Sequence, residues 1–473
     1  MEILSRLRIE ANKNDQSRHD LLVVSNFYRL VKPVFSGYTE PVMWTVFKGY
    51  FMEVFEIQGG KKLSGTIAVA GLKNAATPIL AATLLTKETC VLKNVPRIED
   101  VFRMIEILES LGATIEWQGD HEVAITARDI DVTRVDQEII KRLRSSIMLL
   151  GALSARVDHF EIRQPGGCVI GARPVGTHID ALEKLGVHIV GDGKSYVVDA
   201  TQKKSGKVVL QGLSVTATEN AMLLAATLPG TTVIKVAACE PHVEDLGKFL
   251  QALGVEITGL GTHTLTIVGK AILGGATYTI MPDHNEAATF LVLGAVTGSE
   301  LTVENAREDD LNIVLEKLKE FGVTFTLSDN AITIHPTEHL KAIKPWIDTR
   351  TYPGMPSDNQ SVFGVLATQA EGDTLIFETL YEGRFSYIPE LIKMGARAEI
   401  LNPHQVVIHG KTPLQGTTIK SFDLRAGVAL IIAALAAEGT TIIEEIYQVD
   451  RGYERIEERL QKIGANIVRK EVS

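Results

Sequence analysis

The sequence predicts an α/β (α+β) fold with two lobes of three repeated units each, and two observations carry this prediction. First, an amphipathic helix, a glycine and an alternating strand recur six times along the 473 residues, which indicates an internal repeat. Second, several units also contain a helix that is almost entirely apolar, and such a helix is buried on every side. Six βα units with buried central helices favour two lobes of three units.

The recurring glycine marks the end of a helix in each unit. Neighbouring glycines of this set are 68 to 74 residues apart, which is longer than a solenoid repeat and sufficient for a small α/β module. A residue just past the last helical turn adopts a positive φ, which glycine does without steric cost. We therefore expect a helix to end and a strand to begin at Gly112, Gly186, Gly254, Gly322, Gly395 and Gly464.

The segment 106–117 illustrates one unit. Ile107, Leu108 and Leu111 lie on one helical face, and residues 113–117 then alternate between apolar and polar side chains. This pattern predicts a helix followed by a strand. The predicted buried helices contain no charged residue and cover 75–85, 221–228 and 428–437.

Composition excludes several classes of protein. The chain is 45% hydrophobic and 22% charged, as in globular proteins, and its net charge of -10 argues against a general nucleic-acid binder. Three cysteines are too few for a disulfide framework or a zinc cluster, so we expect a reducing cytoplasm. No apolar run is long enough for a membrane span. Residues 1–51 lack the pattern of a secretory leader and are interpreted as an N-terminal extension of unknown role.

One cysteine lies in a glycine-rich turn. Gly166 and Gly167 precede Cys168, and Arg173 follows five residues later. The glycines allow a small ligand to approach the backbone, and a nearby cation favours the thiolate, so the sulfur could act as an acid or as a nucleophile. The alternative is a half-buried cysteine that acts only as a small hydrophobic side chain.

Cations recur where helices begin. Lys73 and Asn74 open the first apolar helix, and a helix N-terminus favours anions. Any one such cation could be a solvated surface charge, but several at equivalent junctions predict an anionic substrate. Asp358 precedes a later apolar helix and could serve only as its N-cap. The cations at comparable points of later units are Arg144, Arg425 and Arg451.

Four motifs together resemble the UDP-N-acetylglucosamine 1-carboxyvinyltransferase (MurA) family of enolpyruvyl transferases, and the resemblance extends from about residue 52 to 470. They are Gly-Leu-Lys-Asn-Ala-Ala at 71–76, the cysteine turn at 164–174, Pro-Ser-Asp-Asn-Gln at 356–360 and Asp-Arg-Gly-Tyr-Glu-Arg-Ile-Glu at 450–457. The resemblance implies a two-lobed inside-out α/β barrel like that of EPSP synthase. One lobe would comprise residues 73–281 and the other residues 52–72 with 282–473, while residues 1–51 would be an extension or follow a misplaced start.

The resemblance also implies an activity. The enolpyruvyl group of phosphoenolpyruvate would pass to the 3-hydroxyl of UDP-N-acetylglucosamine with release of phosphate, as the first committed step of peptidoglycan synthesis. The protein would thereby serve cell wall biogenesis, cell shape and cell division in the cytoplasm. Neither a metal nor an organic cofactor is expected, the partners are the two substrates without nucleic acid, and the oligomeric state stays open.

By the same resemblance, residues of this chain take roles in the reaction. Cys168 would deliver a proton to the methylene carbon and could form a phospholactoyl adduct, in a loop that closes as a lid. Asp358 would be the base or orienting group at the acceptor hydroxyl, and Lys73, Arg173 and Arg451 would bind phosphoenolpyruvate. The other substrate-binding residues implied are Asn74, Arg144, Pro174, Val175, Gly176, Thr177, Ser214, Val215, Leu380 and Arg425.

The acceptor side departs from the family pattern. A lysine and a glycine that usually bind the nucleotide phosphates are replaced, and loss of one such charge-assisted contact costs roughly 1.5–3 kcal/mol. Two alternatives therefore stay open: an enolpyruvyl transferase that uses a different nucleotide or sugar, and a paralogue that binds a sugar nucleotide without catalysis. The substituted positions are Gly176, Thr177, Gly212, Thr216, His242 and His284.

Overall fold

The repeated unit is visible throughout the computed structural model, which describes residues 52–166, 170–171, 173–337, 339–344 and 346–472. All six repeat glycines have positive φ, between 75° and 104°, and each lies two residues past the end of a helix. At the first of them, Gly112 N donates to Glu109 O (2.9 Å) and Ala113 N donates to Leu108 O (3.0 Å). These two bonds form a Schellman motif, so the predicted C-caps are confirmed.

Buried apolar side chains form two separate cores within the body of residues 53–470. One core contains side chains from residues 72–281, and the other contains side chains from residues 55–69 and 287–467. We call these parts of the chain the first and the second lobe. The limits expected from the sequence, 73–281 and 52–72 with 282–473, stay a prediction, and residues 1–51 lie outside the described residues.

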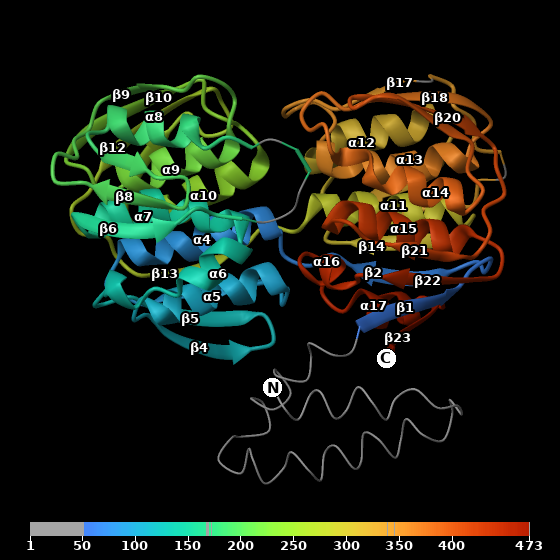
Figure 1. The fold of residues 1–473 in the computed structure, drawn as a ribbon, viewed down its shortest axis with the longest axis horizontal. Coiled ribbons are helices and arrows are strands. Elements are labelled where there is room, and N and C mark those ends of the chain that lie inside the picture. The colour runs from blue at the N-terminus through green and yellow to red at the C-terminus, as the bar shows by residue number, and fades with distance from the viewer. Residues whose placement is uncertain (1–51, 167–169, 172, 338, 345, 473) are drawn as a thin grey trace, which may run out of the picture. The chain divides into compact units, whose positions relative to one another are not determined.

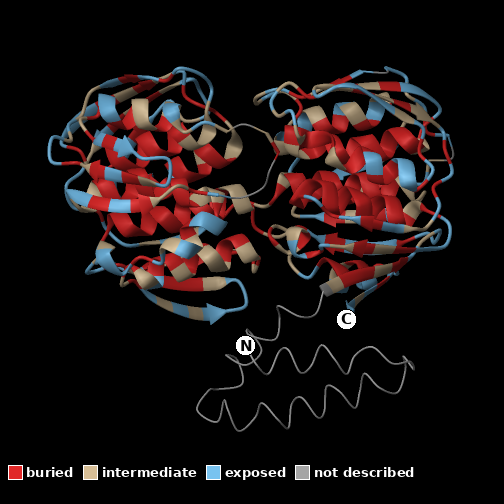
Figure 2. Cartoon of the chain, viewed as in Figure 1, coloured by how far each residue is buried: buried red, intermediate tan, exposed pale blue. Residues whose placement is uncertain are grey.

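Each lobe has three central helical segments in its interior, and Figure 2 shows that they are buried along most of their length. In the first lobe they are α4 (Lys73–Ala82) with η1 (Thr83–Leu85), η3 (Arg144–Met148) with α7 (Leu149–Arg156), and α9 (Val215–Ala225). In the second lobe they are α11 (His284–Val296), η4 (Ser357–Asn359) with α13 (Gln360–Gln369), and α15 (Leu424–Ala436). The last three pack against one another (Figure 1).

Three small sheets surround the central helices of each lobe, which gives the inside-out arrangement. The sheets of the first lobe have the strand orders β13-β3-β5-β4, β6-β8-β7 and β11-β12-β10-β9. Their strands are β3 (Cys90–Lys93), β4 (Thr114–Gly119), β5 (Glu122–Thr126), β6 (His159–Arg163), β7 (His188–Gly191), β8 (Ser195–Asp199), β9 (Lys207–Val209), β10 (Gly230–Lys235), β11 (Glu256–Thr258), β12 (Thr264–Gly269) and β13 (Ala276–Thr279).

The sheets of the second lobe follow the same plan, with orders β15-β16-β14-β2, β17-β18-β20-β19 and β21-β22-β1-β23. In a typical sheet β14 is parallel to β2 and antiparallel to β16. Their strands are β1 (Met52–Gln58), β2 (Ser64–Ala68), β14 (Glu300–Glu304), β15 (Phe325–Ser328), β16 (Ala331–Ile334), β17 (Trp346–Asp348), β18 (Gly372–Phe377), β19 (Ala398–Asn402), β20 (Gln405–Gly410), β21 (Thr418–Lys420), β22 (Thr440–Glu444) and β23 (Asn466–Val472).

The remaining helices are amphipathic or short and lie outside the central ones. In the first lobe they are α5 (Glu99–Ser110), η2 (Val132–Arg134), α6 (Gln137–Arg142), α8 (Gly176–Lys184) and α10 (Pro241–Ala252). In the second lobe they are α12 (Glu308–Glu320), η5 (Arg384–Tyr387), α14 (Ile388–Lys393), α16 (Tyr447–Asp450) and α17 (Ile456–Lys462). Within the described part of the chain, no helix is long and apolar enough to cross a membrane.

The predicted buried helix 75–85 matches the structure closely, while the other two were placed too late. The range 75–85 falls on α4 with η1, whereas the range 428–437 begins after the start of α15. The range 221–228 covers only the second half of α9 and passes its end. Glu219 and Asn220 interrupt the apolar pattern, yet both are buried in the middle of the helix.

Candidate functional site

Charged side chains at the ends of helices form the candidate site. The first cluster centres on Asp100 in the first turn of α5. Its Oδ2 is 3.1 Å from Nζ of Lys73, the first residue of α4, and its Oδ1 accepts a hydrogen bond from Nε of Arg451 at 2.9 Å. Burial acts to raise the pKa of Asp100, but Lys73 and Arg451 together lower it below its usual value. One carboxylate thus brings together two predicted cations, one from each lobe.

Sequence reasoning missed Asp100. Glu99 and Asp100 read as the acidic first turn that favours a helix N-terminus, and nothing local distinguishes the second carboxylate from the first. Glu99 pairs with Arg103 on the same helix, whereas Asp100 is buried and pairs across the molecule. Only the contacts made in the folded protein distinguish Asp100 from Glu99.

The second cluster centres on Asp358, which lies in η4. Its Oδ1 accepts a hydrogen bond from Nη2 of Arg384 (2.5 Å) and its Oδ2 accepts one from Nη2 of Arg425 (2.9 Å). Burial would raise the pKa of Asp358, but Arg425, Arg384 and Lys73 hold it well below its usual range. Asp358 is therefore a carboxylate at neutral pH.

The alternative that Asp358 is only an N-cap is wrong. The N-cap of α13 is Asn359, the N-cap of η4 is Pro356, and neither helix end has a side-chain cap bond. Its side chain instead keeps 24% of its surface exposed between two guanidinium groups. Arg384 was not predicted, because it lies in a segment between β18 and α14 with no helix-start signal.

Arg425 is held rigidly at the start of α15. Asp423 caps this helix, accepting hydrogen bonds from the backbone N–H groups of Arg425 (2.9 Å) and Ala426 (3.0 Å). Nη1 of Arg425 donates to the hydroxyl of Tyr453 (3.2 Å), which in turn lies 2.8 Å from the hydroxyl of Thr289. With only 4% of its side chain exposed, Arg425 has its position fixed from three sides.

The predicted residues around the cysteine turn are placed only in part. Cys168 and Gly167 lie outside the described residues. Nη2 of Arg144, the first residue of η3, donates to the backbone carbonyl of Arg173 at 2.7 Å. Burial and the neighbouring Arg173 both lower the pKa of Arg144. The backbone at Gly166 is so close to the carbonyl of Lys141 that a Cβ there would lie 1.9 Å from its oxygen.

Two of the segments that depart from the family pattern meet in the first lobe. Pro174 precedes Val175, which is the N-cap residue of α8, and Gly176 and Thr177 are the first two residues of this helix. Ser214 caps α9 by accepting from Ala217 N (3.3 Å), and Val215 is the first residue of that helix. The link between these segments is a 2.7 Å hydrogen bond between His178 Nε2 and Thr216 Oγ1. Burial and Arg144 lower the pKa of His178 to about 4, so its imidazole is neutral at pH 7.

Two predicted residues lie near these clusters without a side-chain bond to them. Asn74 is the second residue of α4 and is half-buried. Leu380 is 38% exposed, and its backbone N–H donates to Glu378 Oε1 at 2.9 Å. Both are available to a ligand.

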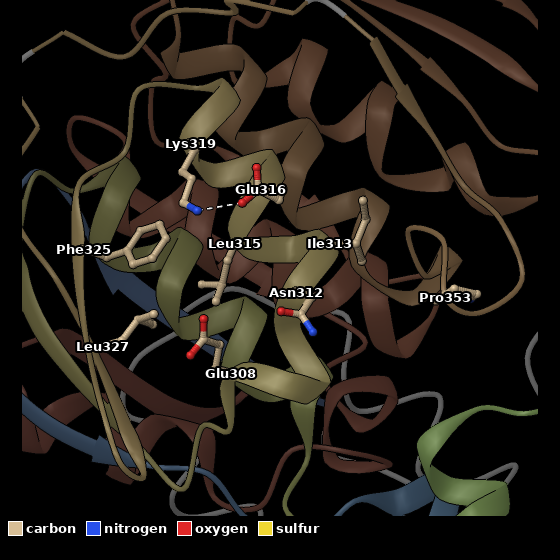
Figure 3. Close-up of a pocket in the computed structure, with 9 residues that line it drawn as sticks. All are labelled: Glu308, Asn312, Ile313, Leu315, Glu316, Lys319, Phe325, Leu327 and Pro353. Carbon is tan, nitrogen blue, oxygen red and sulfur yellow. Dashed lines mark hydrogen bonds and ion pairs between the residues drawn. The ribbon is translucent and has the colours of Figure 1, made fainter. Parts of the chain in front are cut away.

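A pocket of about 280 Å³ lies elsewhere, on the face formed by α12 and β15 (Figure 3). Its lining includes Asn312, Phe325, Leu327 and the ion pair of Lys319 with Glu316 (2.6 Å). None of the predicted site residues lines this pocket, so it is not the candidate site.

Comparisons with known proteins identify the family of this chain. The family model described as EPSP synthase (3-phosphoshikimate 1-carboxyvinyltransferase) matches residues 57–460. The UDP-N-acetylglucosamine 1-carboxyvinyltransferase of Koribacter versatilis is 40% identical over 421 residues, which are 88% of this chain and 96% of the relative. That of Glaesserella parasuis is 42% identical over 420 residues, which are 88% of this chain and 98% of the relative.

Solved structures share the fold. The enolpyruvyl transferase NikO from Streptomyces tendae superposes with a TM-score of 0.81 at 26% identity, covering 89% of this chain and 100% of its own. An EPSP synthase from Acinetobacter baumannii superposes with a TM-score of 0.68 at 20% identity, with the same coverage. The predicted EPSP-synthase-like fold is confirmed.

Proposed function

Because the chain belongs to the UDP-N-acetylglucosamine 1-carboxyvinyltransferase family of enolpyruvyl transferases, we propose that it transfers the enolpyruvyl group of phosphoenolpyruvate to the 3-hydroxyl of UDP-N-acetylglucosamine. Phosphate is the second product. The observation that carries the proposal is the pairing of Lys73 and Arg451, from different lobes, on the single carboxylate of Asp100. The sequence and structure together support two functions of the site, binding of a doubly anionic substrate and orientation of a hydroxyl.

Lys73 and Arg451 bind the anionic groups of phosphoenolpyruvate in this proposal. Its phosphate and carboxylate call for converging cations, and charge-assisted hydrogen bonds are the strongest available. Asp100 holds the two cations in place and offsets part of their mutual repulsion before the substrate arrives. The predicted partner Arg173, with Arg144 on its carbonyl, supplies a further cation beside the cysteine turn.

Asp358 orients the acceptor hydroxyl. A general base works best when its pKa is near the operating pH, whereas the pKa of Asp358 is far below that. Its two arginine partners leave a partly exposed carboxylate that accepts a hydrogen bond from a hydroxyl and fixes its direction toward the carbon that is attacked. Of the two roles expected from the sequence, we therefore favour orientation over proton abstraction.

Cys168 supplies the proton to the methylene carbon. Phosphoenolpyruvate is an enol phosphate, so addition of the hydroxyl oxygen to its C2 releases the hydroxyl proton and places a proton on the methylene carbon, and elimination of phosphate later removes a proton from that carbon. This role is inferred from the cysteine turn in the sequence, since Cys168 lies outside the described residues. We expect neither a metal nor an organic cofactor to take part.

The physiological setting follows from the reaction. Transfer to UDP-N-acetylglucosamine would commit it to peptidoglycan synthesis, and hence to cell wall biogenesis, cell shape and cell division. The compartment that this reaction implies is the cytoplasm. Nucleic acid is not a proposed partner.

An acceptor panel tests the proposal. Phosphate release from phosphoenolpyruvate is measured with the purified full chain, first with UDP-N-acetylglucosamine and then with other nucleotide sugars and free nucleotides. Release that depends on UDP-N-acetylglucosamine is the expected result. Release only with another acceptor would favour the alternative transferase, for which the rewired contact of His178 with Thr216 is the supporting observation, and no release would favour a binding protein.

A further inference from the structure

Two imidazoles, one from each lobe, lie next to each other without a hydrogen bond between them. His242 is the second residue of α10 and His284 is the first residue of α11. Their ring centroids are 6.4 Å apart and their planes differ by 20°. This stacked pair is the place where two substitutions of the family pattern meet, although the sequence separates them by about forty residues.

Both rings keep an unused polar atom. Among the described residues, Nδ1 of His242 and Nδ1 of His284 are buried and have no hydrogen-bond partner. His242 is only 7% exposed, so bulk water does not satisfy its ring. A buried polar atom without a partner is costly, and such atoms in native proteins commonly await a ligand or an ordered water.

Both rings are also uncharged at neutral pH. Burial and the adjacent His284 lower the pKa of His242 to about 3. Burial lowers the pKa of His284 as well, although Asp283 and Asp310 act in the opposite direction. A neutral imidazole carries one donor and one acceptor nitrogen, so each ring can meet either kind of polar group.

The pair lies on the acceptor side of the candidate site. Helix α11, which His284 opens, packs against η4, which carries Asp358, and against α15, which carries Arg425. The carboxylate of Asp358 is close enough to act on the pKa of both imidazoles. The repeat thus places His284, Asp358 and Arg425 at the starts of the three central helices of the second lobe. Asp358 and Arg425 are already paired with each other, whereas His284 is paired with neither of them.

We infer that His242 and His284 determine acceptor specificity by receiving an uncharged polar group of the acceptor, a hydroxyl or an amide, on their free Nδ1 atoms. The inference rests on the proposed function, because it assigns these residues to the same site. A carboxylate or phosphate is disfavoured at this position because the rings carry no charge and Asp358 is a nearby anion. Hydroxyl and amide groups, in contrast, both donate and accept, as the two rings do.

The test uses substitutions that keep or remove a polar atom at the Nδ1 position. Asn places its amide near Nδ1 of the histidine it replaces, Gln places it near Nε2, and Phe provides ring volume without polarity. Each is introduced into the full chain at His242 and at His284. His188, which is exposed on β7, is changed to Gln as the matched control. The KM for UDP-N-acetylglucosamine, the KM for phosphoenolpyruvate and kcat are measured for each variant.

We expect His242→Phe, His242→Gln and the same changes at His284 to raise the acceptor KM by about tenfold, the effect of one lost buried hydrogen bond. His242→Asn and His284→Asn should stay within about threefold of wild type, and the KM for phosphoenolpyruvate should not change in any of them. If both rings contact one group, the double Phe variant loses less than the product of the single losses.

Two results would overturn the inference alone: an unchanged acceptor KM in the Phe variants, or Asn variants as impaired as the Phe variants. Thermal unfolding of each variant separates a folding defect from a binding defect. Phosphate release by the wild-type protein with UDP-N-acetylglucosamine tests the proposed function independently, because it does not depend on the behaviour of the histidine variants. Absence of that release would overturn the proposed function and this inference with it.

Discussion

Asp100 of the first lobe binds Arg451 of the second, with Oδ1 2.9 Å from Nε, and the same carboxylate binds Lys73 through Oδ2. Lys73 and Asp100 come from the consecutive helices α4 and α5, whereas Arg451, at the end of α16, lies 351 residues after Asp100 in the chain. The contact therefore couples the positions of Lys73 and Arg451, the two cations proposed to bind phosphoenolpyruvate, to the way the lobes meet. In this proposal Asp100 supports substrate binding without touching the substrate.

Replacement of Asp100 should weaken binding of phosphoenolpyruvate. In Asp100→Asn the two cations lose their charged partner and repel each other, so we expect the kcat/KM for phosphoenolpyruvate to fall roughly 10- to 100-fold, or about 1.4 to 3 kcal/mol. Steady-state kinetics with varied phosphoenolpyruvate measures it. Glu99→Gln is the matched control, because Glu99 lies one residue earlier and pairs with Arg103 at the surface, where a pair contributes about 1 kcal/mol or less. Equal effects of the two changes would contradict this role for Asp100.

Replacement of Asp358 should lower kcat more strongly than it weakens substrate binding. Asp358→Asn removes the negative charge between Arg384 and Arg425, so the acceptor hydroxyl loses its strongest hydrogen-bond acceptor. We expect kcat to fall by about 100-fold or more, as for loss of one preorganised polar group. Because Arg425 is left buried and partly unpaired, the melting temperature should fall as well. A folded variant that retains more than about a tenth of the wild-type kcat would speak against orientation by Asp358.

The buried His178 should make the protein less stable as the pH falls. Its pKa is about 4 in the folded chain and 6.5 in the unfolded chain, so between these values the unfolded chain binds a proton that the folded chain does not. The free energy of unfolding then decreases with falling pH, by up to about 1.4 kcal/mol per unit. Urea unfolding at pH 7 and pH 5 measures this dependence. His178→Gln, which keeps a polar group near Thr216, should reduce the slope, and a slope equal to that of wild type would refute the assignment.

The repeat glycines should resist substitution for conformational reasons alone. At Gly464 the φ of 96° is unfavourable for any other residue, yet an added Cβ would meet no atom within 4 Å. We therefore expect Gly464→Ala to lower the free energy of unfolding by about 1 to 2 kcal/mol. Gly206→Ala is the control, because Gly206 has the same free space without the positive φ. Equal free energies of unfolding for the two variants would contradict a conformational requirement for glycine at this C-cap.

Local features of the sequence predicted most of the fold and two of the three residues in each charge cluster. The C-cap glycines and the cations at helix starts depend on a few neighbouring residues, so their pattern is visible in the sequence. Lys73, Arg425 and Arg451 were found in this way, and the first two lie at the start of a central helix and the last at the end of α16. Asp358, the partner of Arg425, was predicted as well, whereas Asp100 and Arg384 were not.

What the sequence could not predict depends on contacts between distant segments. Asp100 reads as an ordinary acidic residue of a first helical turn, and Arg384 reads as a surface residue of a loop, until folding brings both to their partners. Helix α9 was placed too late for the same reason. Asn220 breaks the apolar pattern, but its Oδ1 accepts a hydrogen bond from the backbone of Gly151 (2.7 Å) in another central helix. A polar residue that is satisfied only in the tertiary structure looks like an exposed one in the sequence.

If this protein joins the enolpyruvyl group to the acceptor sugar, the chemical structure of the nucleotide product will show it. The purified full chain is incubated with phosphoenolpyruvate and UDP-N-acetylglucosamine, and the nucleotide product is analysed by mass spectrometry and NMR. We expect a sugar nucleotide that carries an enolpyruvyl ether on its 3-hydroxyl, with one phosphate released per product. Unmodified UDP-N-acetylglucosamine after prolonged incubation, or an ether at another hydroxyl, would contradict it.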